Sequence, residues 1–272
     1  MATPIGNLGD ITLRALEILR AVTLVAAEDT RMTRRLWARH GLGTRLVSYH
    51  ARNAATRGPD LLAHLRAGSD LAIVTDAGTP LVSDPGESLV RAWADEGGRV
   101  VPVPGPSAVL AALVAAGLPA ARWGFEGFLP RGGAERRSRL ARIAADDRTT
   151  VLFEAPLRTA TTLRDLAGAC GSDRRAALCR ELTKLHEEIR RGSLAELAIE
   201  ARDRPPRGEV TLVIAGRPEV DVDRQAEAGA QDVAAARRRV AALVAGGLSR
   251  ASAAKQVAAE TGLPRRDLYD AG

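Results

Sequence analysis

The sequence is poor in cysteine and contains no long apolar run. Its two cysteines, Cys170 and Cys179, form no CxxC pair and no disulfide framework, which is typical of a reducing compartment. No apolar stretch approaches the ~20 residues of a membrane span. The N-terminus has neither the basic start nor the apolar segment of a signal peptide. We therefore expect a cytoplasmic protein that does not enter a membrane.

Lysine and aromatic residues are also scarce. Only Lys184 and Lys255 are lysines among 39 basic residues, and aromatic residues make up 3% of the chain. Arginine stays protonated in proteins, whereas burial can lower the pKa of a lysine, so Lys184 is a rare candidate base. Few aromatics argue against base-stacking platforms. The net charge of +6 and the pI near 10.2 permit a polyanionic partner.

The length of 272 residues predicts about two domains. Strand-like apolar runs alternate with helix-like stretches, which predicts an α/β fold, with a mostly parallel sheet formed by the strands between residues 23 and 103. The predicted strands are 23–27, 46–49, 71–75, 99–103, 123–129, 150–153, 176–180 and 209–215. We divide the chain into an N-terminal α/β domain (1–118), a C-terminal α/β domain (119–217) and a helical tail (232–272).

The tail has the shape of a helix-turn-helix. A helix is predicted over 232–244, and Ser249 is a suitable N-cap for a second helix over 250–260, which Gly262 ends. The helical segment after Gly262 is short, so it has little length for reading a major groove. Two interpretations stay open, a packing or oligomerisation element and a nucleic-acid-contacting tail.

Common catalytic motifs are missing. There is no phosphate-binding GxxxxGK[ST] loop, and Gly41-Leu42-Gly43 lacks the third glycine of a dinucleotide fingerprint. Gly105–Val109 lacks the last glycine of a nucleophile elbow, and Arg190 replaces the second histidine of a zinc HExxH helix. Four scattered histidines show no ligand spacing, so no metal site is expected. These absences exclude dehydrogenase, P-loop NTPase, serine hydrolase and zinc peptidase.

What remains is a set of loops at strand ends, over 3–10, 28–31, 75–87 and 102–108. Ligands of open α/β sheets bind at the carboxyl ends of strands, so Asp76 and Gly78 are predicted to contact a ligand. Asp10 is predicted to be an N-cap, and Asp84 and Glu87 to form a capping box. The helix start after Pro104 suits an anion.

Six segments in this order resemble the RsmI family, the ribosomal RNA small subunit methyltransferase I family of the tetrapyrrole methylase superfamily. They are Ala2–Asp10, Ala27–Arg31, Asp76–Gly86, Gly105–Ala108, Phe153–Arg158 and Arg180–Lys184. The resemblance covers residues 2–216, and the tail is similar to that family's C-terminal helix-turn-helix. The family normally has an apolar strand before the Thr3–Asp10 loop, whereas this sequence begins two residues before Thr3, so either the start site is misassigned or the strand is missing.

The resemblance implies two α/β domains with S-adenosylmethionine in a cleft between them, and a homodimer. It implies 2′-O-methylation of a cytidine ribose in the decoding centre of 16S rRNA, within the assembled 30S subunit. The strand-end loops are then the expected cofactor site. The expected cofactor-binding residues are Pro4, Gly6, Asp76, Gly78, Thr79, Ser83, Pro104, Ser107 and Ala108.

No catalytic tetrad is evident, so the candidates for a base are Lys184, Glu181, Asp29 and Glu28. Neighbouring glutamates favour a charged Lys184, which would then hold a phosphate instead.

An arginine-rich helix over 136–142 is the expected RNA surface, although such a helix is as often an ordinary solvated face. The expected RNA-binding residues are Arg31, Arg136, Arg137 and Arg139. Two other functions stay open, a tetrapyrrole methyltransferase and a non-enzymatic nucleic-acid-binding regulator.

Overall fold

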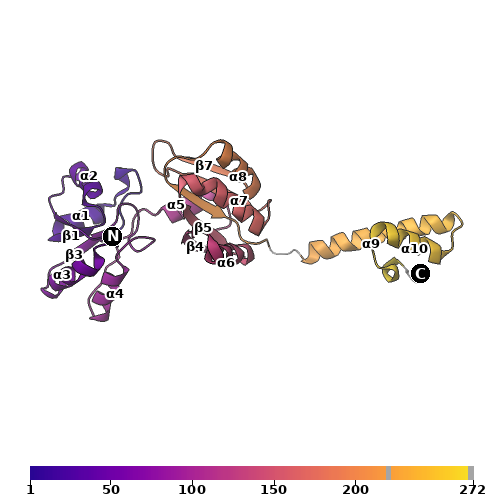
Figure 1. Cartoon of the computed structure of the whole chain (residues 1–272), viewed down its shortest axis with the longest axis horizontal. Coiled ribbons are helices and arrows are strands. Elements are labelled where there is room, and N and C mark those ends of the chain that lie inside the picture. Colours follow the sequence, from indigo (N-terminus) through magenta and orange to yellow (C-terminus); the bar gives the residue numbers. More distant parts are fainter. Residues whose placement is uncertain (219–221, 269–272) are drawn as a thin grey trace. The chain divides into compact units, whose positions relative to one another are not determined.

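The computed structural model describes residues 1–218 and 222–268, with the backbone alone for 222–232. The chain divides into two compact units, Met1–Arg217 and Pro218–Gly272. The first unit contains two β-sheets with helices on both faces, and the second is helical (Figure 1). The α/β fold class predicted from the sequence is therefore confirmed.

The first sheet is parallel, as the sequence predicts, and has the strand order β2-β1-β3. Its strands are β1 (Leu24–Ala27), β2 (Arg45–Ser48) and β3 (Leu71–Val74). Side chains of β1 alternate between two cores: Val25 packs with helices α1 (Leu13–Ala21) and α2 (Thr30–His40), and Ala26 with α3 (Ala54–Arg66) and α4 (Glu87–Asp95). Helices thus cover both faces, and the strand-end loops are left at the edge.

Residues 99–103 form no strand, which corrects the prediction for this segment. Instead, the first residues of the chain form hydrogen bonds with this segment, with β3 and with the loop after β3. The Met1 amino group donates to the Ile73 carbonyl (3.1 Å), the Ala2 N–H donates to the Val103 carbonyl (3.1 Å), and Thr3 forms an isolated antiparallel bridge with Gly78. The start of the chain is therefore tied to β3 and the loop that follows it.

The second sheet is mixed, with the order β4-β5-β8-β6-β7. Its strands are β4 (Trp123–Phe128), β5 (Thr149–Glu154), β6 (Arg175–Arg180), β7 (Glu188–Ser193) and β8 (Val210–Ile214). Only β4 and β5 pair in parallel, because β8 inserts antiparallel to both β5 and β6. The parallel pairing predicted for the first sheet therefore does not extend to this half of the unit.

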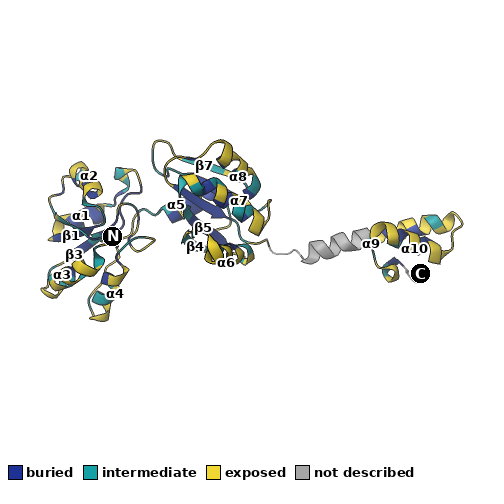
Figure 2. Cartoon of the chain, in the orientation of Figure 1, coloured by how far each residue is buried: buried dark blue, intermediate teal, exposed yellow. Residues whose placement is uncertain are grey.

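The two faces of the second sheet are covered by different helices. Leu152, Leu178 and Leu212 face one core, formed with helices α6 (Gly133–Ala145), α7 (Thr159–Cys170) and α8 (Leu194–Asp203). Their neighbours Val151, Cys179 and Val213 face helix α5 (Ala108–Ala116) on the other side. Figure 2 shows this sheet as mostly buried. Helix α5 precedes residue 119 yet packs on this sheet, and the domain boundary at 118 stays a prediction.

The second unit has a small core of its own. Helices α9 (Val222–Ala245) and α10 (Arg250–Thr261) and the short 3₁₀ helix η3 (Arg265–Leu268) bury residues such as Val240, Val257 and Leu268. The Ser249 hydroxyl accepts a hydrogen bond from the Ser252 N–H, and Gly262 ends α10 in the left-handed conformation, as predicted. Residues 269–272 of the predicted tail lie outside the described residues.

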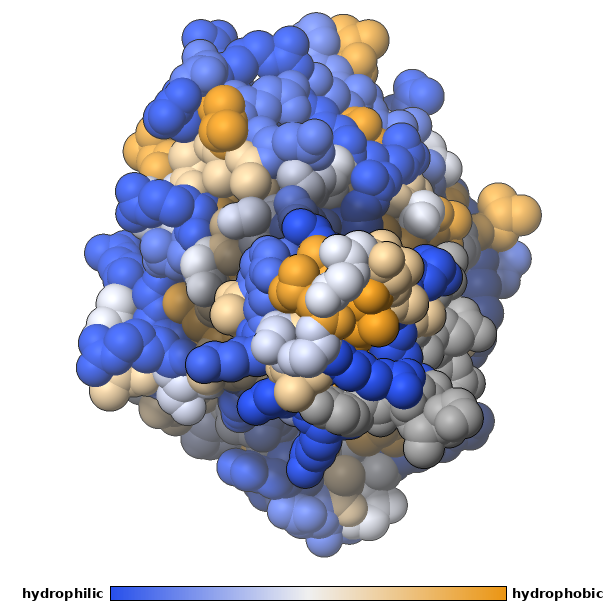
Figure 3. Space-filling view, turned by 90° about the vertical axis from the view of Figure 1, so that its right-hand side faces the viewer, coloured by the Kyte–Doolittle hydropathy of each residue, from blue (hydrophilic) through white to orange (hydrophobic). Residues whose placement is uncertain are grey.

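Within 1–218 and 222–268, no helix has both the length and the apolar character needed to cross a bilayer. Figure 3 shows a face on which hydrophilic residues predominate and hydrophobic ones gather in small patches.

Candidate functional site

The loops after β1 and β3 are joined at one edge of the first sheet. The Asp29 N–H donates to Asp76 Oδ1 (3.0 Å), and the Asp76 N–H donates to Glu28 Oε2 (3.4 Å). Asp29 also caps α2, accepting from the Arg31 N–H (2.8 Å), and its carboxylate pairs with the Arg31 guanidinium. Parallel strands bring Glu28, Asp29 and Asp76 together, as the sequence predicts for strand ends.

The carboxylates at this edge differ in basicity. Hydrogen bonds from Arg31 lower the pKa of Asp29 to about 2. Burial raises the pKa of Glu28 and of Asp76. Burial, reinforced by the negative charge of Glu28, raises the pKa of Asp84 to about 6. The edge therefore carries one carboxylate that is a weak base and three that bind protons more readily.

The loop over 3–10 crosses this edge and is held by the loop after β3. Thr3 Oγ1 donates to the Thr75 carbonyl (2.9 Å), and Gly78, at φ 76°, exchanges two backbone hydrogen bonds with Thr3. Thr79 Oγ1 in turn donates to the Pro106 carbonyl (3.5 Å). The loops predicted to bind the cofactor are therefore in mutual contact.

The same loop reaches the second sheet through Gly6 and Asn7. The Asn7 N–H donates to Thr183 Oγ1 (3.2 Å). Gly6 lies against the Lys184 side chain so closely that an added Cβ would be 2.4 Å from Lys184 Cγ. This contact joins the loop after β6 to the loops of the first sheet within Met1–Arg217.

Lys184 is held by two carboxylates. Its Nζ donates to Glu181 Oε1 (2.8 Å) and to Glu209 Oε2 (3.1 Å). Burial lowers the pKa of Lys184, but these hydrogen bonds outweigh it and leave the pKa above its ordinary value. The hydrogen bond from Lys184 lowers the pKa of Glu181. Lys184 is therefore an ammonium group at neutral pH, which fits a phosphate-holding role better than that of a base.

Backbone strain is concentrated in two of these loops. In the described part of the chain, the non-glycine residues with positive φ are Leu81 (71°), Ser83 (69°), Glu181 (50°) and Thr183 (67°). Such conformations cost about 1–3 kcal/mol each and persist where the surroundings fix them, often at ligand sites. Two belong to the loop after β3 and two to the loop after β6, the loops that carry Asp76 and Lys184.

Two predictions of helix caps need correction. Thr12, rather than Asp10, caps α1 by accepting from the Ala15 N–H (3.2 Å). The proposed capping box of Asp84 and Glu87 does not form, because α4 begins at Glu87 after Gly86, whose φ is 129°. Asp84 is thereby free to lie near Glu28.

The remaining predicted cofactor residues surround these contacts. Pro4 is buried, two residues before Gly6, and Pro104 is exposed. Ser107 caps α5 by accepting from the Leu110 N–H (3.4 Å), and Ala108 is its first residue. Ser83 lies near β4, since its Oγ would be 3.3 Å from a Cβ added at Gly127.

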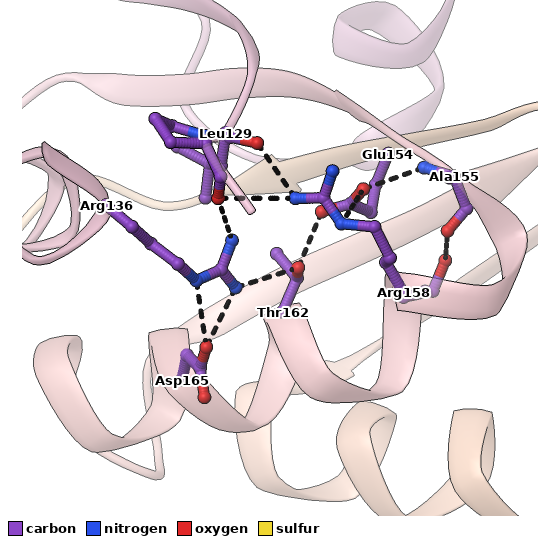
Figure 4. A network of polar contacts seen from close by, with 9 residues as sticks. Leu129, Arg136, Glu154, Ala155, Arg158, Thr162 and Asp165 are labelled. Carbon is purple, nitrogen blue, oxygen red and sulfur yellow. Dashed lines mark hydrogen bonds and ion pairs between the residues drawn. The ribbon is translucent and has the colours of Figure 1, made fainter. Parts of the chain in front are cut away.

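The arginines predicted to bind RNA have different surroundings. Arg31 has an 85% exposed side chain, paired with Asp29. Arg137 is exposed, but Arg139 is held by Glu126 (2.8 Å). Arg136 is buried: it bonds to Asp165 (2.8 Å), Thr162 (3.0 Å) and the Pro130 carbonyl (2.9 Å), as Figure 4 shows. The prediction that Arg136 faces RNA does not agree with this burial.

Glu209 is the site residue that the sequence did not reveal. It follows a loop and carries no motif, and its contact with Lys184 depends on the antiparallel register that places Arg180 opposite Val210. Knowing that β8 pairs antiparallel with β6 would have revealed this contact, since Glu209 directly precedes β8.

Comparison with known proteins agrees with this architecture. Residues 2–198 match the Tetrapyrrole (Corrin/Porphyrin) Methylases. The structure of cobalt precorrin-4 methyltransferase superposes with a TM-score of 0.60 at 19% identity, covering 79% of this chain and 92% of that one. Uroporphyrin-III-C-methyltransferase from Thermus thermophilus gives 0.55 at 21% identity, covering 78% and 91%. The fold is thus that of a tetrapyrrole methylase, a class of methyltransferase enzymes.

More similar relatives narrow the assignment. Proteins named ribosomal RNA small subunit methyltransferase I are 44% identical in Synechocystis sp., 45% in Pseudomonas aeruginosa and 46% in Xylella fastidiosa (strain Temecula1). Each alignment covers 99% of this chain and at least 94% of the relative. The chain belongs to the ribosomal RNA small subunit methyltransferase I family.

Proposed function

We propose that this protein methylates 16S rRNA of the small ribosomal subunit, using S-adenosylmethionine, at the ribose 2′-hydroxyl of a cytidine (C1402). The contact of Gly6 with Lys184 carries the proposal, because it joins the strand-end loops of the first sheet to the charged loop after β6. The family of named rRNA methyltransferases supports the substrate class. The cytoplasm, where ribosomal subunits are modified, is the proposed location.

The residues present fit S-adenosylmethionine. A cationic sulfonium and ammonium suit the carboxylate edge of Glu28, Asp76 and Asp84. At Gly78, the left-handed backbone lets the loop after β3 bond to Thr3 and lie against Ile5, which fixes this side of the site. The N-terminus of α5 at Ser107 would hold the carboxylate of the cofactor. When bound, the cofactor supplies an electrophilic methyl group.

The chain must align the ribose oxygen and accept its proton. Lys184 is an ammonium group and would hold an RNA phosphate beside the target ribose. Asp29 is paired with Arg31, and its pKa of about 2 makes it a weak base. Glu28, Asp76 and Asp84, whose pKa values are raised by burial, are the stronger bases at this edge.

Methyl transfer to isolated 30S subunits tests this function. Subunits from a strain that lacks the methyl group would be incubated with labelled S-adenosylmethionine, and 2′-O-methyl groups mapped on the rRNA. We expect labelling at one cytidine, and a loss of about tenfold or more in Lys184→Met. The matched control is Lys255→Met, which removes the other lysine of the chain from an exposed position. Unchanged turnover in Lys184→Met would remove Lys184 from the site.

The other two functions predict different results. Labelling of a porphyrin precursor instead of 30S subunits would identify a tetrapyrrole methyltransferase. No binding of S-adenosylmethionine in calorimetry would instead favour a non-enzymatic regulator.

We also propose that the enzyme is a homodimer. Helix α5 is apolar throughout, yet its Leu110 and Val114 side chains are 50% and 84% exposed. A helix that is apolar on all sides is normally buried, and a second copy would cover this face. Light scattering should report a dimer, and Val114→Asp should shift it toward monomer. A monomeric wild-type protein would contradict this proposal.

A further inference from the structure

A pocket of ≈ 690 Å³ lies on the second sheet beside the loop that carries Lys184. It is formed by the end of β6, the start of β7 and the loop that follows α8. Four arginines line it: Arg180, Arg190, Arg204 and Arg207. None of them was among the residues predicted to bind RNA.

One carboxylate binds three of these arginines. Glu188 accepts from Arg180 Nε (2.6 Å) and Arg190 Nε (2.8 Å), and it also pairs with Arg204. Hydrogen bonds from Arg190 and Arg180 lower the pKa of Glu188 to about 2, so it stays ionised. Arg190 also pairs with Glu200 (3.3 Å), so two carboxylates face these three guanidinium groups. Glu188 therefore orders the arginines and leaves one positive charge in excess.

Two arginines are available to a ligand. Arg204 has a 65% exposed side chain. Arg207 is exposed, and in the part of the chain that the structure describes it has no ion-pair partner within 4.0 Å. Of the other carboxylates in the lining, Asp203 pairs with Arg202, and Glu187 accepts from the Thr183 N–H (2.7 Å). An exposed guanidinium group without a carboxylate partner, beside arginines that a carboxylate orders, is typical of phosphate recognition.

The pocket lies beside the proposed methyl-transfer site, since its lining includes Arg180 and Leu185, on either side of Glu181 and Lys184. Arg180 Nη1 donates to the Arg207 carbonyl (3.2 Å), and the nearby Glu181 N–H donates to the Glu209 carbonyl (3.0 Å). Glu181 and Glu209 are the two partners of Lys184. A chain of phosphates that passes the Lys184 ammonium would therefore meet the arginines next.

We propose that this arginine-lined pocket binds the sugar-phosphate backbone of the RNA beside the target nucleotide. The proposal rests on the proposed function and identifies where the substrate docks. It replaces the helix over 136–142 as the main RNA surface, because Arg136 is buried and Arg139 is held by Glu126.

The test compares two double variants of the full chain. Arg204→Ala/Arg207→Ala removes two charges from the pocket while Arg180 and Arg190 still hold Glu188. Arg122→Ala/Arg164→Ala removes two exposed charges elsewhere, from side chains that are 69% and 73% exposed. Binding to 30S subunits and to a fluorescent RNA hairpin of the decoding region would be measured from 50 to 200 mM salt.

We expect the pocket variant to bind both probes about tenfold more weakly at low salt. Its slope of log affinity against log salt should fall by about 1–2, since each phosphate contact contributes ~0.7–0.9. The control variant should match the wild type, and calorimetry should give the same affinity of all three proteins for S-adenosylmethionine.

Other outcomes overturn the inference. Equal binding by the two variants would exclude the pocket as an RNA site. Weaker binding to 30S subunits alone, with unchanged binding to the hairpin, would show that the pocket contacts a ribosomal protein. If the wild type methylates 30S subunits, either result leaves the proposed function in place. Absence of methylation in the wild type would refute the function itself.

Discussion

Gly6 and Lys184 lie so close that no side chain fits between them. A Cβ at Gly6 would be 2.4 Å from Lys184 Cγ and 2.7 Å from Lys184 Cε. Both atoms belong to the stem of a side chain whose ammonium group is fixed by Glu181 and Glu209. The lysine therefore cannot move aside without giving up at least one hydrogen bond.

Gly6→Ala should reduce methyl transfer by about 10²-fold, because a displacement of ~1 Å at a reacting centre costs about that much. Steady-state rates with 30S subunits would measure it. Gly43→Ala is the matched control, since nothing lies within 4 Å of an added Cβ there and Gly43 has no positive φ. A Gly6→Ala enzyme with the rate of the Gly43→Ala enzyme would show that the contact is unimportant.

Asp84 should make stability depend on pH. Its pKa is about 6 in the folded protein and about 4 in an unfolded chain. The native state therefore binds more protons between these values, and stability should fall as pH rises from about 4 to 6. Asp84→Asn should raise the free energy of unfolding by about 1–2 kcal/mol at pH 7 and leave it unchanged near pH 4.

Urea unfolding at the two pH values would measure this difference. Asp70→Asn is the control, because Asp70 is exposed and makes no ion pair within the described residues. Equal gains at both pH values in Asp84→Asn would contradict the assigned cause.

Arg136 should matter for stability and not for RNA binding. Its side chain is 8% exposed, and Arg136→Met would leave Asp165, Thr162 and the Pro130 carbonyl without their guanidinium partner. We expect a loss of about 3 kcal/mol in unfolding free energy. Arg137→Met, on the exposed side of the same helix, should change it by less than about 0.5 kcal/mol. Weakened RNA binding at unchanged stability in Arg136→Met would reverse this assignment.

Cofactor binding should not need the second unit. The predicted cofactor residues, Pro4 to Ala108, all lie in Met1–Arg217, and the helical unit buries its own core. A chain ending at Arg217 should bind S-adenosylmethionine with an affinity within about twofold of the full chain in calorimetry. A tenfold loss, with circular dichroism showing an intact fold, would mean that the helical unit contributes to the cofactor site.

Local signals in the sequence predicted helix caps only in part. Ser249 caps α10 as expected, because an N-cap depends on one side chain and the next three residues. The capping box of Asp84 and Glu87 failed although its sequence is correct. The positive φ angles of Ser83 and Gly86 change the direction of the chain just before α4, so Asp84 does not reach the start of the helix. A sequence pattern does not reveal such backbone strain.

Contacts between distant segments were harder to predict. Strand β7 was not predicted, because its charged residues do not alternate regularly with apolar ones. It lies at the edge of the sheet beside β6, where charged side chains are tolerated. The proximity of the loops at the edge of the first sheet could be predicted from its parallel topology. The contact of Gly6 with Lys184 did not, because it depends on how the two sheets pack and no local pattern encodes that.

The central place of β8 has a consequence for synthesis of the chain. This strand is the last of the five to be translated, yet it must lie between β5 and β6. Until it leaves the exit tunnel, the nascent polypeptide has only two separate strand pairs, and isolated pairs are marginally stable. The sheet therefore closes late in synthesis, in one step. The hydrogen bond between Glu209 and Lys184 forms only after that step.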